Sequence, residues 1–448
     1  MYETERIDGV ASEKAVLVRV ILPGQVVGDD PLDEITGLAE TAGARVVSGM
    51  IQRRETPDVT AYLGKGKIEE LKNAVAHHDA DVVIFDNDLA PSQTRNLERA
   101  VGVKVLDRTE LILDIFASNA KTYEARLAVE LAQLEYSLPR LKRMWSHLSR
   151  IKAGIGMRGP GEKQIEEDRR LVETRIHELR SELKEIEKRK ERLVASRSDR
   201  LTVSLVGYTN AGKSTLMNAL TGAGVLAANK LFATLDTRTR RWMLPSWGPV
   251  LLSDTVGFIR DLPHGLIASF KATLEEARQA DLLLHVADAA NPAVLDQISA
   301  VYEVLRELGI QEKDTLLVLN KVDRLRDRGA LMPVLHRYPN AIPISARTRD
   351  GFDALHHAAS DALSRSFADL DVEMSVSNGR MLAYLAAHGE ILGRHYDNDG
   401  DRVLIHVRLP QRHLGALHEK GTSFRTHQPI LPAARESIDS PTAIEDVA

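Results

Sequence analysis

Apolar residues recur in steps of four and three through the middle of the chain, and this spacing constrains the fold more than any other feature. The first run is Leu127, Leu131, Leu134, Leu138, Leu141, Trp145 and Leu148, and the second is Ile165, Val172, Ile176, Leu179, Leu183, Ile186 and Leu193. Such spacing places apolar side chains along one face of a helix. Two such helices joined by a short connection are expected to pair antiparallel. The spacing therefore predicts a helical hairpin whose first helix has roughly 29 residues, or about 40 Å.

The connection between the two runs is rich in glycine and in positive charge. Residues 140–163 contain seven lysines and arginines but only one acidic residue, a net charge of +6 in a chain whose formal charge is −5. Glycine permits a flexible turn, and clustered positive charge favours contact with nucleic-acid phosphates. A solvated charge run is the alternative for this segment. Trp145 is expected to pack in the helical seam rather than to stack on a base.

Strand-like apolar runs alternate with helix-like segments on both sides of the hairpin, which predicts a multidomain α/β fold. The length of 448 residues allows roughly three domains. We expect five segments: an N-terminal α/β domain at 1–118, the antiparallel hairpin at 119–198, a P-loop domain at 199–367, a small α+β C-terminal domain at 368–420 and a mobile tail at 421–448.

Several classes of protein are excluded by composition. The chain has no cysteine, so disulfides, thiolate nucleophiles and zinc–cysteine sites are absent, and a reducing cytoplasmic location is expected. No apolar run reaches the roughly 18 to 20 residues that a membrane span needs. The first residues do not show the pattern of an export signal, so none is expected. The oligomeric expectation is a monomer.

The stretch from Gly207 to Ser214 fits the pattern G-x-x-x-x-G-K-[ST], between an apolar strand and a helical run. Backbone N–H groups of such a loop cradle phosphates, and the helix N-terminus favours negative charge. Lys213 is expected to reach the β- and γ-phosphates, and Ser214 to bind Mg²⁺. The expected nucleotide contacts are Gly207, Tyr208, Thr209, Asn210, Ala211, Gly212, Lys213, Ser214 and Thr215.

Three further motifs follow strands in the order that a P-loop GTPase requires. They are Asp254, Thr255, Val256 and Gly257; Asn320, Lys321, Val322 and Asp323; and Ser345, Ala346 and Arg347. Asp254 is expected to hold Mg²⁺ and Gly257 to sense the γ-phosphate. Asp323 can accept hydrogen bonds from guanine, whereas adenine offers no donors there. Together these motifs predict a site for GTP and GDP at the carboxyl ends of the strands.

A threonine that closes over the metal is expected between the P-loop and Asp254. The candidate segment is Phe232, Ala233, Thr234, Leu235 and Asp236. Thr234 is our choice, with Thr237 and Thr239 as alternatives. The predicted metal ligands are therefore Ser214, Thr234 and Asp254, and the predicted catalytic groups are Lys213, Thr234 and Gly257.

Phe258 occupies the position where Ras-like enzymes carry a glutamine that orients water. An apolar ring cannot align a nucleophile, so hydrolysis is expected to be slow unless a partner orders the site. The alternative is that Phe258 belongs to the core and another residue positions water.

These motifs, with four further stretches, resemble the HflX family of translational GTPases over nearly the whole chain. The further stretches are Tyr62–Lys67, Ala132–Leu134, Leu138–Leu141 and Arg158–Glu162. The resemblance implies binding to the large ribosomal subunit, insertion of the hairpin tip toward ribosomal RNA near the peptidyl transferase centre, and GTP-controlled splitting or rescue of stalled ribosomes during stress. Met157 and Lys163 depart from the common family tip. Some related GTPases with an asparagine like Asn210 bind potassium, so we expect K⁺ to raise turnover.

Two other functions stay open at this point. The turn Gly64–Lys67 precedes a helix, so the N-terminal domain could bind an adenine nucleotide and drive RNA remodelling, although a turn with exposed lysines is the simpler interpretation. The hairpin could alternatively bind a protein partner in a signalling switch, because helical seams often do so.

Overall fold

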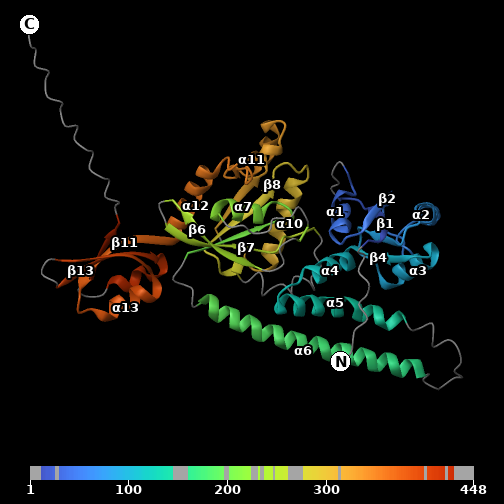
Figure 1. Cartoon of the computed structure of the whole chain (residues 1–448), viewed down its shortest axis with the longest axis horizontal. Helices are drawn as coiled ribbons and strands as arrows, with labels where there is room; N and C mark the ends of the chain where they lie inside the picture. The colour runs from blue at the N-terminus through green and yellow to red at the C-terminus, as the bar shows by residue number, and fades with distance from the viewer. Residues whose placement is uncertain are drawn as a thin grey trace, which may run out of the picture. The chain divides into compact units, whose positions relative to one another are not determined.

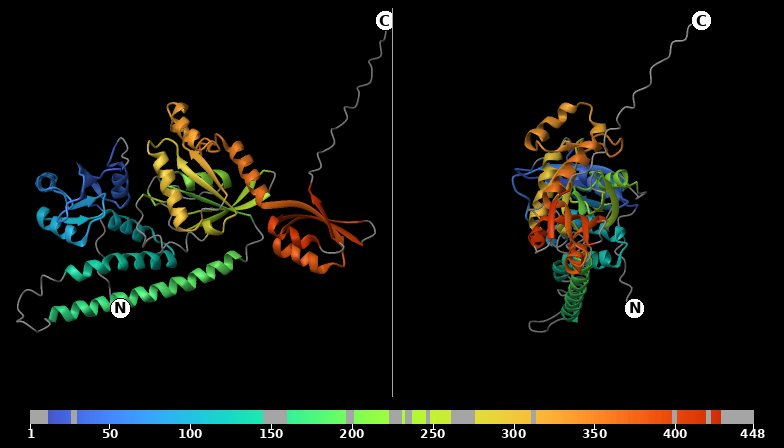
Figure 2. Two further views of the ribbon diagram at one scale, coloured as in Figure 1. Left: turned by 180° about the vertical axis from the view of Figure 1, so that it is seen from behind. Right: turned by 90° about the vertical axis from the view of Figure 1, so that its left-hand side faces the viewer.

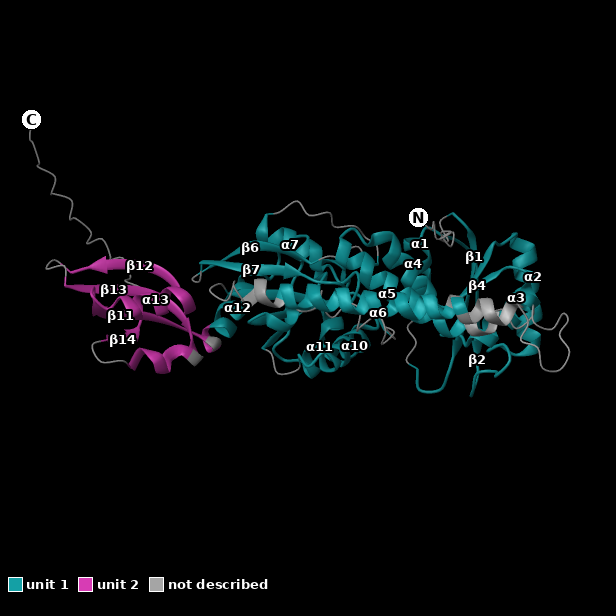
Figure 3. Ribbon diagram, turned by 90° about the horizontal axis from the view of Figure 1, so that it is seen from below, with its two compact units in different colours: residues 1–363 teal, residues 364–448 magenta. Residues whose placement is uncertain are grey.

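The computed structural model describes residues 12–25, 30–144, 160–195, 201–222, 231–232, 237–245, 248–260, 276–310, 314–397, 401–418 and 422–427. The chain divides into two compact units, residues 1–363 and 364–448 (Figure 3). Among the described residues, none of the helices combines the length and apolar character that a membrane crossing requires.

A four-stranded parallel sheet forms the N-terminal part of the first unit, in the order β2-β1-β3-β4 (Figure 1). The strands are β1 (Lys14–Ile21), β2 (Arg45–Arg53), β3 (Val82–Phe85) and β4 (Lys104–Leu106). The helices are α1 (Asp33–Thr41), α2 (Lys65–His78), α3 (Pro91–Val101) and α4 (Arg108–Asn119). Leu17 and Ile84 join one apolar core, and Val16 and Val83 join another. Burial on both faces explains why the central strands β1 and β3 read as nearly continuous apolar runs.

The predicted hairpin is confirmed by α5 (Tyr123–Met144) and α6 (Pro160–Ala195), which lie side by side in Figures 1 and 2. Their shared core consists of Leu127, Leu131, Leu134 and Leu138 from α5 with Val172, Ile176, Leu179, Leu183 and Ile186 from α6. Helix α6 begins at Pro160, within the stretch expected to be non-helical, because proline suits the first position of a helix. The basic tip, including Trp145, lies outside the described residues.

A six-stranded sheet forms the P-loop domain, in the order β10-β9-β8-β5-β7-β6, and only β6 runs antiparallel to its neighbour. Its strands are β5 (Thr202–Gly207), β6 (Arg238–Leu244), β7 (Gly248–Asp254), β8 (Leu282–Asp288), β9 (Thr315–Asn320) and β10 (Ile342–Pro343). Its principal helices are α7 (Lys213–Thr221), α10 (Val294–Glu307), α11 (Met332–Arg337) and α12 (Phe352–Ser366). The carboxyl ends of β5, β7, β8 and β9 meet at one edge, which is where open α/β sheets bind ligands.

The second unit contains an antiparallel sheet in the order β12-β13-β11-β14, with α13 (Gly379–His388). The strands are β11 (Phe367–Ser375), β12 (Glu390–Tyr396), β13 (Arg402–Pro410) and β14 (Thr422–Thr426). Strand β14 corrects the expectation of a tail that begins at residue 421. It pairs with β11, and the partly buried ring of Phe424 packs against the apolar core of this unit, so these contacts stabilise a polar stretch as a strand.

Candidate active site

The P-loop connects the end of β5 at Gly207 to the start of α7 at Lys213. Two of its glycines occupy positions where a larger side chain would overlap neighbouring atoms. Gly207 has φ of +148° and Gly212 has φ of +93°, both rarely adopted by other residues. A Cβ on Gly207 would lie 2.1 Å from the Val286 carbonyl oxygen, and one on Gly212 would lie 2.4 Å from Asn320 Nδ2. The loop is therefore built in close contact with β8 and β9.

Lys213 is buried at the start of α7 and its ammonium group faces the loop. Its Nζ donates hydrogen bonds to the carbonyl oxygens of Gly207 at 3.0 Å and Tyr208 at 2.9 Å. Burial lowers the pKa of Lys213 to about 8, although nearby Asp254 acts in the opposite direction. A phosphate in the loop would add negative charge beside this buried cation, and an opposite charge stabilises the protonated form.

Ser214 and Asp254 converge from α7 and β7. The Ser214 hydroxyl donates a hydrogen bond of 2.5 Å to Asp254 Oδ2, and the Asp254 side chain is buried. A hydroxyl and a carboxylate are hard oxygen ligands, and Mg²⁺ bound with nucleotide uses only a few such protein groups together with water and phosphate. The donor set therefore fits Mg²⁺, and it does so although the described residues contain no cluster of three or more His, Cys, Asp or Glu suited to a metal.

The base-binding motifs are tied to the P-loop by Asn320. Its amide donates to the Ala211 carbonyl oxygen at 2.9 Å, and its Oδ1 accepts from the Ala346 N–H at 2.9 Å. The Ser345 hydroxyl donates to Asp323 Oδ1 at 2.7 Å, which orients an exposed carboxylate. The structure thus brings the P-loop together with two motifs that lie more than 100 residues after it in the chain.

Lys321 reinforces this junction from a left-handed backbone conformation, with φ of +67°. Its Nζ donates to the Asn210 carbonyl oxygen at 2.7 Å and pairs with Asp288 at 2.7 Å. Val322 is buried in the neighbouring apolar core, whereas Arg347 is exposed at the rim. Asp288, at the end of β8, was not anticipated because nothing in its local sequence indicates that Lys321 lies beside it.

Gly257 lies directly against the P-loop. A Cβ at this position would lie 2.8 Å from Thr209 Cα and 3.1 Å from Lys213 Nζ. The next residue is joined to the loop by two backbone hydrogen bonds, from Thr209 N–H to the Phe258 carbonyl at 2.6 Å and from Phe258 N–H to the Gly207 carbonyl at 3.1 Å. The Phe258 ring is buried in the apolar core, which agrees with the alternative that it serves packing.

The side chains of four predicted contact residues are engaged by neighbouring parts of the protein. Phe232 is buried against the Phe116 ring, with centroids 4.5 Å apart. Thr255 donates its hydroxyl to the Leu205 carbonyl at 2.7 Å, and Val256 lies in the core. The Phe232 ring is therefore used for packing, as burial of a large apolar side chain favours, and any contact of this residue with the nucleotide stays a prediction.

Tyr208 is the fourth of these residues, and its hydroxyl faces the N-terminal domain.

The loop residues Ala233–Asp236, with the preferred metal ligand Thr234, lie outside the described residues. The alternatives Thr237 and Thr239 hydrogen-bond Glu276 at 3.2 and 3.4 Å. Thr215 is exposed on α7.

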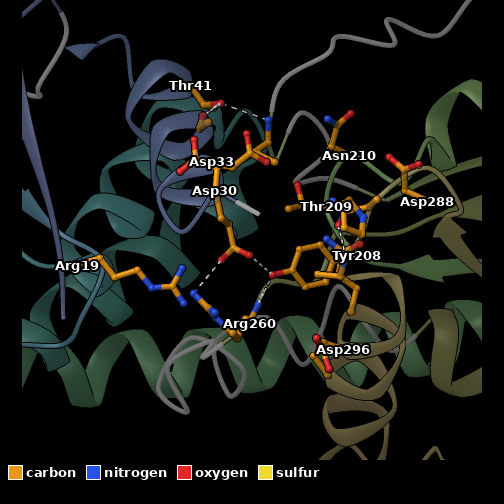
Figure 4. Close-up of a pocket in the computed structure, with 18 of the residues that line it drawn as sticks. Arg19, Asp30, Asp33, Thr41, Tyr208, Thr209, Asn210, Arg260, Asp288 and Asp296 are labelled. Carbon is orange, nitrogen blue, oxygen red and sulfur yellow. Dashed lines mark hydrogen bonds and ion pairs between the residues drawn. The ribbon is translucent and has the colours of Figure 1, made fainter. Parts of the chain in front are cut away.

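Sequence reasoning missed a charged cluster between the N-terminal sheet and the P-loop. Its members are Arg19, Glu34, Asp86, Arg108 and Arg260. Figure 4 shows two members of this cluster, Arg19 and Arg260, beside Tyr208. Arg19, Glu34 and Arg260 line a cavity of about 800 Å³ that also reaches Asn210 and Asp288. The one available signal was Arg19, a charged residue inside the apolar run of β1.

Three family profiles match consecutive parts of the chain. Residues 29–117 match "GTP-binding GTPase N-terminal", residues 119–197 match "GTP-binding GTPase Middle Region", and residues 202–321 match "50S ribosome-binding GTPase".

Curated relatives match over most of their own length. GTPase HflX of Lacrimispora saccharolytica is 44% identical, covering 92% of this chain and 98% of the relative. GTPase HflX of Escherichia coli K12 is 46% identical, covering 89% and 94%. A solved complex of SsGBP with GDP is 27% identical with a TM-score of 0.46, covering 79% of this chain and 99% of that one. Identity of this extent to curated relatives, together with the P-loop geometry, shows that the chain is a P-loop GTPase and belongs to the HflX family.

Proposed function

We propose that this GTPase binds the large ribosomal subunit, directs the hairpin tip toward ribosomal RNA near the peptidyl transferase centre, and uses GTP to control splitting or rescue of stalled ribosomes under stress. The observation that carries the proposal is the match of residues 202–321 to a 50S ribosome-binding GTPase profile in a chain that also has a long helical hairpin. The proposed setting is the cytoplasm, with the protein acting as a monomer.

The hairpin consists of two long helices that stabilise each other through their own apolar seam and ion pairs. Helix α6 has 36 residues, which at 1.5 Å per residue is roughly 54 Å. Its apolar seam is flanked by ion pairs to α5, from Arg175 to Glu130 at 2.8 Å and from Lys190 to Glu124 at 2.7 Å. Two helices stabilised in this way can place the basic residues that connect them at a phosphate-lined site distant from the GTPase domain.

We propose the following division of work at the nucleotide. Lys213 and the backbone N–H groups of the P-loop stabilise charge on the phosphates, Ser214, Thr234 and Asp254 hold Mg²⁺, and the Gly257 N–H responds to the γ-phosphate. When bound, Mg²⁺ would neutralise charge on the β- and γ-phosphate oxygens. Asp323 selects guanine, and the Ser345 hydroxyl orients the Asp323 carboxylate.

The proposed potassium site rests on Asn210, which adopts a left-handed conformation with φ of +58° at the exposed edge of the loop. We expect GTP turnover to be faster in potassium than in sodium at matched ionic strength. Equal rates in the two salts would reject a potassium site.

The turn at Gly64–Lys67 is explained by the N-terminal fold, so we propose no adenine-nucleotide function for it. The Gly64 N–H donates to Gln52 at 3.1 Å, and Lys67 pairs with Glu70 at 2.6 Å. Gly64 precedes the first turn of α2 in an extended conformation, as a helix start requires.

GTP turnover with and without purified large ribosomal subunits tests the proposed function. In the decisive variant, glutamine replaces Arg150, Lys152 and Arg158. In the control variant, glutamine replaces Lys184, Lys188 and Arg189, which are exposed on α6. We expect the subunits to stimulate turnover, with the tip variant losing the stimulation and the control retaining it. Absence of stimulation in the unmodified protein would refute the ribosomal partner, and equal stimulation of both variants would refute the role of the tip.

A further inference from the structure

Arg140 lies near the end of α5, and its guanidinium contacts the N-terminal domain. Its Nη2 donates to the Leu89 carbonyl oxygen at 3.1 Å and pairs with Asp107 Oδ2 at 2.9 Å. Its Nη1 donates to the Tyr136 carbonyl oxygen at 3.1 Å, one turn earlier in the same helix. Arg140 is one of the seven basic residues of the segment 140–163, and its charge is paired within the protein.

The Tyr136 ring lies against the guanidinium of Arg140. The guanidinium carbon is 3.4 Å from the centre of the ring. A planar cation stacked in this way keeps the N–H groups at its edge directed at Asp107 and Leu89. Burial and the charge of Asp107 raise the pKa of Tyr136, so its hydroxyl stays protonated. A lysine could not form this set of contacts, because an ammonium group is a compact charge without a planar fork of donors.

Asp107 is the buried carboxylate that receives Arg140. It caps α4 by accepting a hydrogen bond from the Glu110 N–H at 2.9 Å, and it accepts another from the Leu89 N–H at 3.3 Å. Burial raises the pKa of Asp107, whereas Tyr136, the Glu110 N–H and Arg140 act in the opposite direction. Removing the charge of Arg140 would leave a buried carboxylate without its paired cation, which is costly.

Arg140 continues the face of α5 that packs on the N-terminal domain. Ala125, Val129 and Ala132 belong to the apolar core that includes β1 and α4, and Tyr136 packs against that core. Helix α5 contacts both α3 and α4 along this face (Figure 1). Steps of four and three residues lead from Ala125 to Arg140, so the arginine takes the next position on the same face.

This face is narrow, so its last contact has most influence on the direction of the helix. Alanine and valine side chains permit close packing but offer no directional bond. Helix α5 has 22 residues, a length of about 33 Å, so a rotation of about 10° at its start would move its far end by about 6 Å. The polar contacts of Arg140 lie near that far end, where they resist such a rotation most effectively.

We propose that Arg140 sets the direction in which the hairpin leaves the N-terminal domain, by fixing the far end of α5 to Asp107 and Leu89. Arg140 is a positioning residue, since it acts on the hairpin tip through the helix. The inference rests on contacts within one compact unit and does not require a ribosomal partner. Under the function proposed above, the direction that Arg140 fixes determines which site the tip reaches.

The distance between the hairpin and the N-terminal sheet domain tests the proposal. The chain has no cysteine, so Lys72→Cys on α2 and Glu167→Cys on α6 create two unique sites for spin labels, both at exposed positions. Double electron–electron resonance on the full chain gives the distribution of distances between the labels. We expect Arg140→Met to broaden this distribution and to shift its mean by about 6 Å, the displacement that a rotation of about 10° produces.

Two controls separate this effect from general damage. Arg126→Met is the matched control, because Arg126 is exposed on the same helix and bonds only locally, to the Lys121 carbonyl oxygen at 3.0 Å. We expect it to leave the distribution unchanged. A reference pair of labels at Gln133→Cys and Glu167→Cys lies within the hairpin. An equally large change for this reference pair in Arg140→Met would mean that the hairpin itself is disrupted, and would overturn the proposal.

Asp107→Asn perturbs the same contact from the other side and keeps an oxygen acceptor for the Glu110 N–H. We expect it to broaden the distribution, and the double variant with Arg140→Met to be no broader than the single variants. Arg140→Lys is the milder variant and should give an intermediate width. An unchanged distribution in Arg140→Met overturns the proposal. So does a lower free energy of unfolding with an unchanged distribution, which is the result that a purely structural role predicts.

Stimulation of GTP turnover by purified large ribosomal subunits is a separate readout. We expect Arg140→Met to lose part of this stimulation, because its tip is no longer presented in one direction. The distance measurement uses no ribosomes, so the two failures are distinguishable. Subunits that do not stimulate the unmodified protein would count against the proposed function, whereas unchanged distances would count against the role of Arg140.

Discussion

Ser214 and Asp254 are joined by a 2.5 Å hydrogen bond between a helix start and a strand end that are 40 residues apart in the chain. The contact brings two oxygen donors together where the β- and γ-phosphates of a P-loop nucleotide would lie. We therefore expect Mg²⁺ to bind between the start of α7 and the end of β7.

Ser214→Ala is expected to reduce Mg²⁺-dependent GTP hydrolysis by on the order of 100-fold, because one metal ligand is lost while the loop backbone is retained. Turnover measured across a series of Mg²⁺ concentrations checks this. The loss should be partly recovered at high Mg²⁺, and hydrolysis that is unaffected by the substitution would remove Ser214 from the metal site.

Asp323→Asn is expected to weaken GTP binding by roughly 10- to 100-fold, since a charge-assisted hydrogen bond to the base contributes about 1.5–3 kcal/mol. Xanthosine triphosphate has a carbonyl where guanine has an amine, so its relative affinity should increase with the asparagine amide as donor. Competition binding with both nucleotides measures the change. Unaltered selectivity would show that another group recognises the base.

His285 on β8 predicts a pH dependence of stability. Burial, with a further contribution from Lys213, lowers the pKa of His285 to about 3. The unfolded chain therefore binds more protons than the folded chain between about pH 6.5 and pH 3, and the free energy of unfolding falls as pH decreases through this window, by up to about 1.4 kcal/mol per pH unit.

His285→Leu should reduce this acid sensitivity, whereas His357→Leu, at an exposed position on α12, should leave it unchanged. Chemical denaturation from pH 7 to pH 4 gives the slopes. Parallel slopes for the unmodified protein and for His285→Leu would contradict the assignment.

Leu179→Ala in α6 is expected to destabilise the hairpin by about 2–5 kcal/mol, because Leu179 is fully buried between the two helices. Leu171→Ala is the matched control, since that leucine is exposed on the same helix. Amide exchange over α5 and α6 separates a local effect from global unfolding. Equal protection in the two variants would mean that the seam does not stabilise the arm.

Much of the candidate site could be predicted because each motif is a local pattern. Gly207–Ser214, Asp254–Gly257 and Asn320–Asp323 lie directly after apolar strands, and strand ends of a parallel sheet meet at one edge. The helical hairpin could be predicted equally well, since apolar spacing of three and four residues is visible in the sequence alone. The strand Thr422–Thr426 was missed, because its short polar sequence is stabilised by pairing with β11.

The sequence by itself determined the P-loop GTPase domain, the antiparallel hairpin and the basic connection between its helices, because spacing and composition carry those features. Only the tertiary structure decided that the Tyr208 hydroxyl bonds to Glu34 and that the Phe232 ring packs against Phe116. It also decided that Glu34, Arg108 and Arg260 share one cluster. The physical reason is that ion pairs between distant elements depend on how two domains pack, and residues 174 positions apart, such as Glu34 and Tyr208, leave no periodic signal in the chain.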